Sequence, residues 1–291
     1  MTNNFLKKKT SINISGKLLD LSSPIVMGIL NITPDSFYDG GQYNTDEKII
    51  EHAEQILSEG AKILDVGAYS SRPGAKNISE EKELSKLKNA LSIIRKKFPE
   101  AIISVDTFRS SIAEYVVKEF DVNIINDISS GELDDKMFNV IAKLNVPYII
   151  MHMQGTPQNM QLNPKYDDLI KDIIKYLSTK VDKLNLLGVN DVIIDPGFGF
   201  GKTLDNNYEL MNKLDAFKIF QLPILVGVSR KSMIYKYLET TPDEALAGTI
   251  ALNTIALLHD TNILRVHDVK QAVDTIKIVE KLRQNKNKST G

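Results

Sequence analysis

The chain has 291 residues, of which 42% are hydrophobic and 25% are charged, the balance of an ordinary globular protein. Its 36 Lys and Arg against 37 Asp and Glu give a net charge of -1, which excludes a strongly basic nucleic-acid binder. With no Cys and four His, the chain offers no disulfide, thiolate ligand or cysteine nucleophile, and a multi-histidine metal site is not expected.

The predicted elements begin with a short hairpin and continue as a series of apolar runs. Residues 11–21 alternate Ile12 and Ile14, turn at Ser15 and Gly16, and predict a hairpin placed at one end of the fold. Eight Ile- and Val-rich runs follow, which are typical of strands buried on both faces of a parallel sheet. They are Ile25–Leu30, Ile63–Val66, Ile102–Val105, Val122–Ile125, Pro147–Met151, Val192–Ile194, Pro223–Val228 and Asn262–Val266.

Helical patterns separate these runs. Glu80–Lys97 and Tyr166–Leu187 carry apolar residues at spacings of three and four, and Thr241 with Pro242 predicts the start of a helix that runs toward Leu258. Eight strand–helix units in about 250 residues predict a (β/α)8 TIM barrel preceded by the short β-hairpin. An open doubly wound sheet is the alternative, although it more typically has five or six strands.

The chain shows no linker, repeat or composition change, so we expect one domain over residues 1–291 with an ordered core of roughly 11–283. No stretch approaches the ~18 apolar residues of a membrane span, and MTNNFLKKKT at the N-terminus lacks the apolar core of a signal peptide. We therefore expect a cytoplasmic protein.

Polar residues stand at the C-terminal ends of five apolar runs, where a barrel carries its active site. These residues are Asn31, Asp106, Asn126, Asp195, Arg265 and His267. A single Asp after a strand is more often a helix cap or turn residue, and Asp65 and Asp127 are interpreted as structural. Six polar positions that converge on one rim make capping a weaker explanation for the group.

The loops beyond these strand ends add glycines and cations. DPGFGFGKT from Asp195 resembles a phosphate-binding loop but lacks the spacing of a P-loop, so it is weak evidence for nucleotide binding. Arg72, Lys231, Arg265 and His267 form a potential cationic rim in a nearly neutral protein, which favours an anionic substrate.

Eight sequence blocks together resemble dihydropteroate synthase. In order they are MGILNITPDSF, LDVGAYSSRPG, SVDTF, INDISS, MHMQGTP, DPGFGFGKT, GVSRKSMI and RVHDV, and they span residues 27–268. Each block is modestly specific, whereas the ordered set is highly specific. The resemblance implies a (β/α)8 barrel, usually dimeric, that condenses (7,8-dihydropterin-6-yl)methyl diphosphate with 4-aminobenzoate in folate biosynthesis, with Mg²⁺ as cofactor.

The same resemblance implies roles for individual residues. The pterin would contact Asp106, Asn126, Asp195 and Lys231, with Met151 and Phe200 against its ring, although these last two could equally be ordinary core residues. The diphosphate would contact Asn31, Ser71, Arg72, Arg265 and His267, and Asn31 would also be the protein ligand of Mg²⁺. The 4-aminobenzoate would contact Phe37, Pro73 and Ser232, while Asp106, Lys231, Asp35 and Asp39 would assist the chemistry.

The implied mechanism is the departure of diphosphate with charge neutralisation by cations, followed by attack of the aromatic amine. The chain departs from many members of the family at Tyr69, where they have Glu, and at Ser71, where they have Thr. Alternatives are a pterin-binding module without catalysis, a methyltetrahydrofolate-binding methyltransferase and a Schiff-base aldolase that uses Lys231. None of the three explains the pair Arg265 and His267 together with Asn31 and Arg72.

Overall fold

The structure, a computed structural model, describes residues 8–32, 45–69 and 78–288. An antiparallel hairpin comes first, with β1 (Ser11–Ile14) paired to β2 (Lys17–Asp20). Ser15 and Gly16 form its turn with φ of 49° and 88°, a left-handed conformation that glycine adopts without steric cost. The predicted hairpin and its turn are confirmed.

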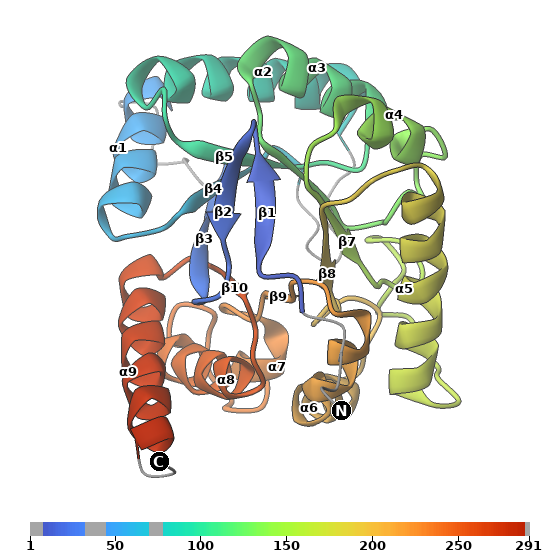
Figure 1. The fold of residues 1–291 in the computed structure, drawn as a ribbon, viewed down its shortest axis with the longest axis vertical. Helices are drawn as coiled ribbons and strands as arrows, with labels where there is room; N and C mark the ends of the chain where they lie inside the picture. The colour runs from blue at the N-terminus through green and yellow to red at the C-terminus, as the bar shows by residue number, and fades with distance from the viewer. Residues whose placement is uncertain (1–7, 33–44, 70–77, 289–291) are drawn as a thin grey trace, which may run out of the picture.

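Eight parallel strands form the central barrel (Figure 1). Its sheet order is β8-β7-β6-β5-β4-β3-β10-β9, and a parallel bridge from Ile194 to Ile224 brings the two ends together. The strands are β3 (Ile25–Asn31), β4 (Ile63–Gly67), β5 (Ile102–Asp106), β6 (Ile124–Asp127), β7 (Tyr148–Met151), β8 (Val192–Asp195), β9 (Leu225–Val226) and β10 (Ile263–Val266). The predicted (β/α)8 barrel is therefore confirmed.

Helices surround the barrel on its outside (Figure 1). They are α1 (Thr45–Ser58), α2 (Glu80–Lys97), α3 (Ser110–Phe120), α4 (Met137–Leu144), α5 (Leu169–Leu186), α6 (Leu204–Asn212), the 3₁₀ helix η2 (Leu214–Phe220), α7 (Ser232–Tyr235), α8 (Leu246–Leu258) and α9 (Val269–Lys288). The prediction that a helix starts at Pro242 is wrong, because α8 begins at Leu246. Glu244 donates its backbone N–H to the carbonyl of Thr241 and accepts a hydrogen bond from the Thr241 hydroxyl, which forms a separate turn before the helix.

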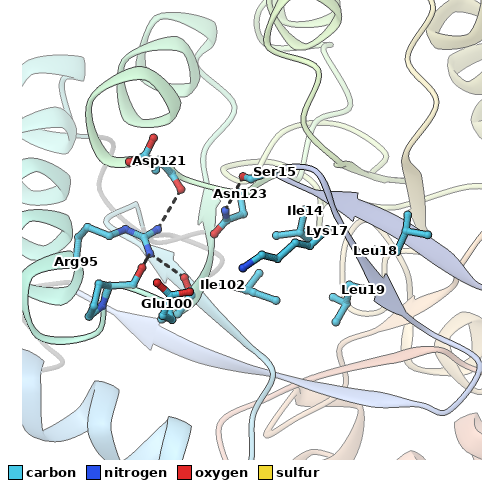
Figure 2. A pocket seen from close by; sticks show the side chains of 12 residues that line it. Ile14, Ser15, Lys17, Leu18, Leu19, Arg95, Glu100, Ile102, Asp121 and Asn123 are labelled. Atoms are coloured by element: carbon cyan, nitrogen blue, oxygen red, sulfur yellow. Dashed lines mark hydrogen bonds between the residues drawn. The ribbon is translucent and has the colours of Figure 1, made fainter.

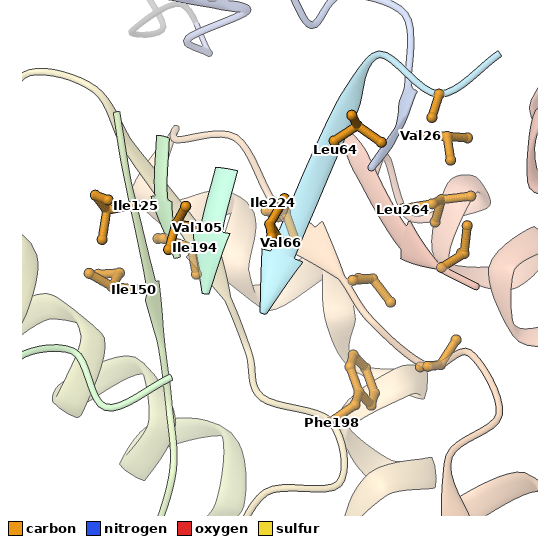
Figure 3. Packing of buried hydrophobic residues seen from close by; sticks show 14 of the residues in the cluster. Val26, Leu64, Val66, Val105, Ile125, Ile150, Ile194, Phe198, Ile224 and Leu264 are labelled. Carbon is orange, nitrogen blue, oxygen red and sulfur yellow. The ribbon is translucent and has the colours of Figure 1, made fainter. Parts of the chain in front are cut away.

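Two layers of apolar side chains hold the barrel together, because successive residues of a strand face opposite sides. Figure 3 shows the outer layer between strands and helices, where Val26, Leu64 and Val105 are fully buried. The inner layer includes Met27, Ile63, Ile124, Ile149, Ile193, Leu225 and Ile263, which pack with Ile12, Ile14 and Leu21 of the hairpin segment. The hairpin therefore closes the N-terminal end of the barrel, opposite the polar strand ends.

A pocket beside the hairpin also lies at this N-terminal end (Figure 2). Arg95 of α2 donates hydrogen bonds there to the carbonyls of Phe120 and Asp121, and Asn123 donates to the hydroxyl of Ser15. These contacts attach the hairpin and α2 to the bottom of the barrel. No helix in the described ranges is both long and apolar enough to cross a membrane.

Candidate active site

Four neighbouring strands each place one residue at the same level of the barrel, next to its C-terminal rim. The register pairs Asn31 of β3 with Gly67 of β4, Gly67 with Asp106 of β5, and Asp106 with Asn126 of β6. All four residues lie at or next to the C-terminal ends of their strands, where a TIM barrel carries its chemistry. The structure therefore brings Asn31, Asp106 and Asn126 together, as the sequence predicts.

Arg265 of β10 lies between two carboxylates at this end of the barrel. Its Nε donates to Oδ2 of Asp65 at 2.6 Å, and its Nη2 donates to Oδ2 of Asp106 at 2.9 Å. Nδ2 of Asn126 also donates to Oδ2 of Asp65, at 3.2 Å. Asp65, which the sequence pattern assigned only a structural role, is thus a member of the polar cluster.

The signal that identifies Asp65 is its place inside a fully buried strand. A carboxylate at that position needs a cation or several donors, because an unpaired buried charge is costly. Asp127 is also fully buried, but its oxygens accept from Ser129, Gly131 and the hydroxyl of Tyr148. Asp127 therefore stabilises its own loop and the neighbouring strand, in keeping with the structural interpretation.

The enclosed charges shift one another's protonation. Burial raises the pKa of Asp106 to about 7, with Asp65 and Asp127 adding to the increase while Arg265 and Lys231 oppose it. Burial lowers the pKa of Lys231 to about 8, against the opposing attraction of Asp195 and Asp106. A carboxylate and an ammonium that both titrate near neutrality are typical of an active site.

The loop after β8 contributes the next set of groups. Oδ1 of the buried Asp195 accepts from the backbone N–H of Gly197 at 2.7 Å, which fixes its carboxylate against the loop. Lys231 donates to the carbonyl of Phe198, and its Nζ lies 4.6 Å from the centroid of the Phe200 ring. Asp195, Lys231 and Phe200 are therefore neighbours, as the sequence predicts.

A small methionine-rich cluster lies apart from the main core, next to this loop. Met151, which is buried, packs there with Ile128, Met153 and Met160, and the rings of Phe108 and Phe200 pack against the cluster. Met151 and Asp195 are register partners on adjacent strands. This arrangement supplies an apolar surface directly beside the buried carboxylate.

A buried lysine, which the sequence analysis did not single out, holds two of the loops together. Nζ of Lys202 donates to the carbonyl of Gly197 at 2.8 Å and to that of Phe200 at 3.1 Å, and it lies 3.0 Å from Nδ1 of His152. Burial, with a contribution from Lys202, lowers the pKa of His152 to about 2, and burial lowers the pKa of Lys202 to about 7. The ring of His152 is therefore neutral and can accept a hydrogen bond from Lys202. Loop packing requires the glycine at position 197, because a Cβ at Gly197 would lie 1.9 Å from the carbonyl oxygen of His152.

Asn31 ends β3, the strand next to β10 in the barrel, and His267 follows β10 two residues after Arg265. A Cβ placed on Gly67 would lie 3.5 Å from Oδ1 of Asn31 and 4.0 Å from Oδ2 of Asp106, so the space above this glycine adjoins both oxygens. Oγ of Ser229 lies 3.1 Å from Nδ1 of His267, which orients the imidazole ring. Among the described residues, no group of three His, Cys, Asp or Glu side chains could hold a metal by itself.

Several predicted residues lie outside the described part of the chain: Asp35, Phe37, Asp39, Ser71, Arg72 and Pro73. Tyr69, the departure from the family pattern, is described and is buried with an edge-to-face contact to Phe108 at 5.1 Å. Its hydroxyl accepts from Nε2 of Gln158 at 2.9 Å, so an aromatic packing contact occupies a position where many family members have Glu. Ser232, the first residue of α7, follows Lys231 directly and is partly exposed.

Comparison with known proteins agrees with this geometry. The family model described as "Pterin binding enzyme" matches residues 27–267. A dihydropteroate synthase of Escherichia coli K12 is 43% identical over 267 residues, which cover 91% of this chain and 94% of that protein. A Yersinia pestis dihydropteroate synthase in a sulfonamide complex superimposes with a TM-score of 0.88 at 40% identity, covering 94% of this chain and 99% of that one. A Xanthomonas albilineans dihydropteroate synthase with 4-aminobenzoic acid has a TM-score of 0.87 at 32% identity, and the match covers 94% of this chain and 98% of that one.

A closed parallel barrel with carboxylates, an arginine and a low-pKa lysine at its C-terminal rim defines a TIM-barrel enzyme that acts on a polar, charged substrate. The matches specify which enzyme. This chain belongs to the dihydropteroate synthase family of pterin-binding transferases. The reaction of this family joins (7,8-dihydropterin-6-yl)methyl diphosphate to 4-aminobenzoate, yielding 7,8-dihydropteroate and diphosphate in folate biosynthesis.

Proposed function

We propose that the chain carries out this condensation at the C-terminal rim, with the pterin held by Asp106, Asn126, Asp195 and Lys231. The observation that carries the proposal is the shared row of Asp106 and Asn126 with Arg265 bonded to Asp106. The pyrimidine edge of a pterin offers neighbouring N–H donors and a carbonyl acceptor. Carboxylates accept such donors in pairs, an amide both donates and accepts, and an ammonium donates to ring oxygen or nitrogen.

The flat ring would lie against the apolar surface next to Asp195. Met151 is part of the methionine-rich cluster and Phe200 packs against it, which supports their proposed place against the pterin faces. Lys231 already lies over the Phe200 ring, so a ligand bound there would contact the cation and the aromatic ring together.

The diphosphate would bind at the side of the site where Asn31, Arg265 and His267 lie. Ser71 and Arg72 complete this proposed set from a segment outside the described residues. Oδ1 of Asn31, which adjoins Gly67, fits a hard cation such as Mg²⁺, whereas Oδ2 of Asp106 on the other side of Gly67 accepts from Arg265. Diphosphate oxygens and water would supply the remaining ligands of the ion. Mg²⁺, when bound, would neutralise charge on the diphosphate.

The chain's own residues would then separate the leaving group from the reacting carbon. Arg265 and His267 would bind the diphosphate as the bond between the methylene carbon and oxygen breaks and both bonding electrons leave with oxygen. The electron-rich dihydropterin stabilises the cationic methylene, and the carboxylate of Asp106 would add electrostatic support. The amine of 4-aminobenzoate then forms the new C–N bond and releases a proton.

The 4-aminobenzoate would lie beyond the pterin, next to Ser232 of α7. Phe37 and Pro73 would complete its surroundings, and Asp35 and Asp39 would assist from the first loop. In sequence these residues follow β3 and β4, the strands that end at Asn31 and Gly67 on this rim. Exclusion of water there would protect the cationic methylene from hydrolysis.

We also propose that the enzyme is a cytoplasmic homodimer of single-domain subunits. Helices α8 and α9 pack together and carry exposed apolar side chains, Ile255 and Leu258 on the first and Ile278 and Leu282 on the second. Exposed apolar side chains on two neighbouring helices favour a protein partner. Sedimentation of the purified chain as a monomer at micromolar concentration would contradict the dimer.

The reaction is tested by measuring diphosphate release from purified protein with Mg²⁺ and the dihydropterin diphosphate, with and without 4-aminobenzoate. Release that depends on 4-aminobenzoate and yields dihydropteroate is the expected result. Tight binding of pterin without any release would instead indicate a pterin-binding module and contradict the proposed catalysis.

A further inference from the structure

Asp65 connects two parts of the proposed site that take different halves of the substrate. One of its oxygens, Oδ2, accepts from Nε of Arg265 at 2.6 Å and from Nδ2 of Asn126 at 3.2 Å. In the barrel order β6-β5-β4-β3-β10, Asp65 stands on β4, two strands from each partner. Its side chain therefore extends into the barrel interior, where it accepts hydrogen bonds from one residue on each side of β4.

The contacts of Asp65 exceed what neutralising Arg265 requires. Asp106 already supplies Arg265 with a carboxylate at 2.9 Å. Within the described chain, Oδ1 of Asp65 and Oγ of Ser104, its register partner on β5, are buried without a hydrogen-bond partner. A fully buried carboxylate that concentrates both hydrogen bonds on one oxygen has a fixed rotation, and such a residue imposes geometry on its neighbours.

The bond to Asn126 determines which way its amide faces. A carboxylate accepts hydrogen bonds and does not donate them, so the NH₂ group of Asn126 must face Asp65. The carbonyl oxygen of Asn126 is then directed away from Asp65, where it can accept an N–H of the pterin. Without Asp65, the amide of Asn126 could rotate by half a turn. Its NH₂ group would then face the N–H donors of the pterin.

The bond to Arg265 matters most when the substrate is bound. Pterin donors would engage the carboxylate of Asp106 and compete with Arg265 for its oxygens. Asp65 would still hold Nε of Arg265, so the guanidinium would keep its orientation toward the diphosphate. We propose that Asp65 is a positioning residue that sets the acceptor face of Asn126 and the orientation of Arg265, and thereby aligns the pterin with its leaving group. This inference rests on the proposed function.

The test compares Asp65→Asn with Ser104→Ala, a matched control that removes a buried, unpartnered polar atom at the same depth. Calorimetry would measure binding of 6-hydroxymethyl-7,8-dihydropterin and of inorganic diphosphate with Mg²⁺ separately, alongside kcat and KM. Asp65→Asn should weaken both ligands by about 10-fold or more and lower kcat, whereas Ser104→Ala should change neither. Weakening of only one ligand, or of neither, would overturn the inference.

The outcomes separate this inference from the proposed function. Wild-type protein that forms no dihydropteroate contradicts the function, while an active wild type with an equally active Asp65→Asn variant contradicts the role of Asp65. If Asp65→Asn does not fold, the cycle of Asn126→Ser, Arg265→Lys and the double variant tests the same link with Asp65 intact. Non-additive losses of substrate affinity are expected because both residues share one oxygen, and additive losses would contradict it.

Discussion

The dependence of the reaction on pH tests the charge arrangement of the site most directly. Asp106 must be ionised to accept the pterin donors, and its raised pKa of about 7 means that this ability is lost as the pH falls through 7. Lys231 must be protonated to donate, and its lowered pKa of about 8 means that donation is lost as the pH rises through 8. For the free enzyme, kcat/KM should therefore reach a maximum near pH 7.5 and be about 20-fold lower at pH 5.5.

The assay is kcat/KM for the dihydropterin diphosphate at saturating 4-aminobenzoate and Mg²⁺, in buffers of constant ionic strength from pH 5 to 10. The substrate diphosphate also titrates, so the Asp106→Asn variant is the control. It should be less active and should lose the part of the acidic limb that Asp106 contributes. An acidic limb that persists unchanged in this variant would show that another group titrates and would refute the assignment to Asp106.

Three further perturbations follow from the geometry. Gly67→Ala should fold normally, because its Cβ would lie at ordinary contact distance from its neighbours. The added methyl group would occupy space between Asn31 and Asp106, so the Mg²⁺ concentration for half-maximal activity should rise. An unchanged Mg²⁺ dependence contradicts the proposed metal position. Lys202→Met should lower the free energy of unfolding in urea by about 1–3 kcal/mol, since carbonyls lose their donor, and an unchanged midpoint contradicts its role in loop closure. Ile12→Ala should cost about 2–5 kcal/mol of stability while kcat stays constant, because the hairpin closes the opposite end of the barrel; a large loss of kcat in folded protein would contradict this separation.

The local pattern of the sequence determined most of the fold. Strand interiors such as Val192–Ile194 are continuous apolar runs because both faces are covered, and the hairpin alternates because only one face is. The polar residues that end these runs, Asp106 and Asn126 among them, were predictable as a group because parallel strands all direct their C-terminal ends to one side. Strand position, spacing and polarity are properties of neighbouring residues, so a sequence displays them directly.

Only the tertiary structure decided how these groups connect. Arg265 bonds to Asp65 and Asp106 from 200 and 159 residues away, and Lys202 bonds to His152 from 50 residues away. A carboxylate inside an apolar strand indicates that it has a partner, but no local pattern shows whether that partner is a distant arginine, as for Asp65, or the residue's own loop, as for Asp127. That distinction depends on which strands become neighbours when the barrel closes, because the free energy of burying a charge is set by the partners that the closed barrel places around it.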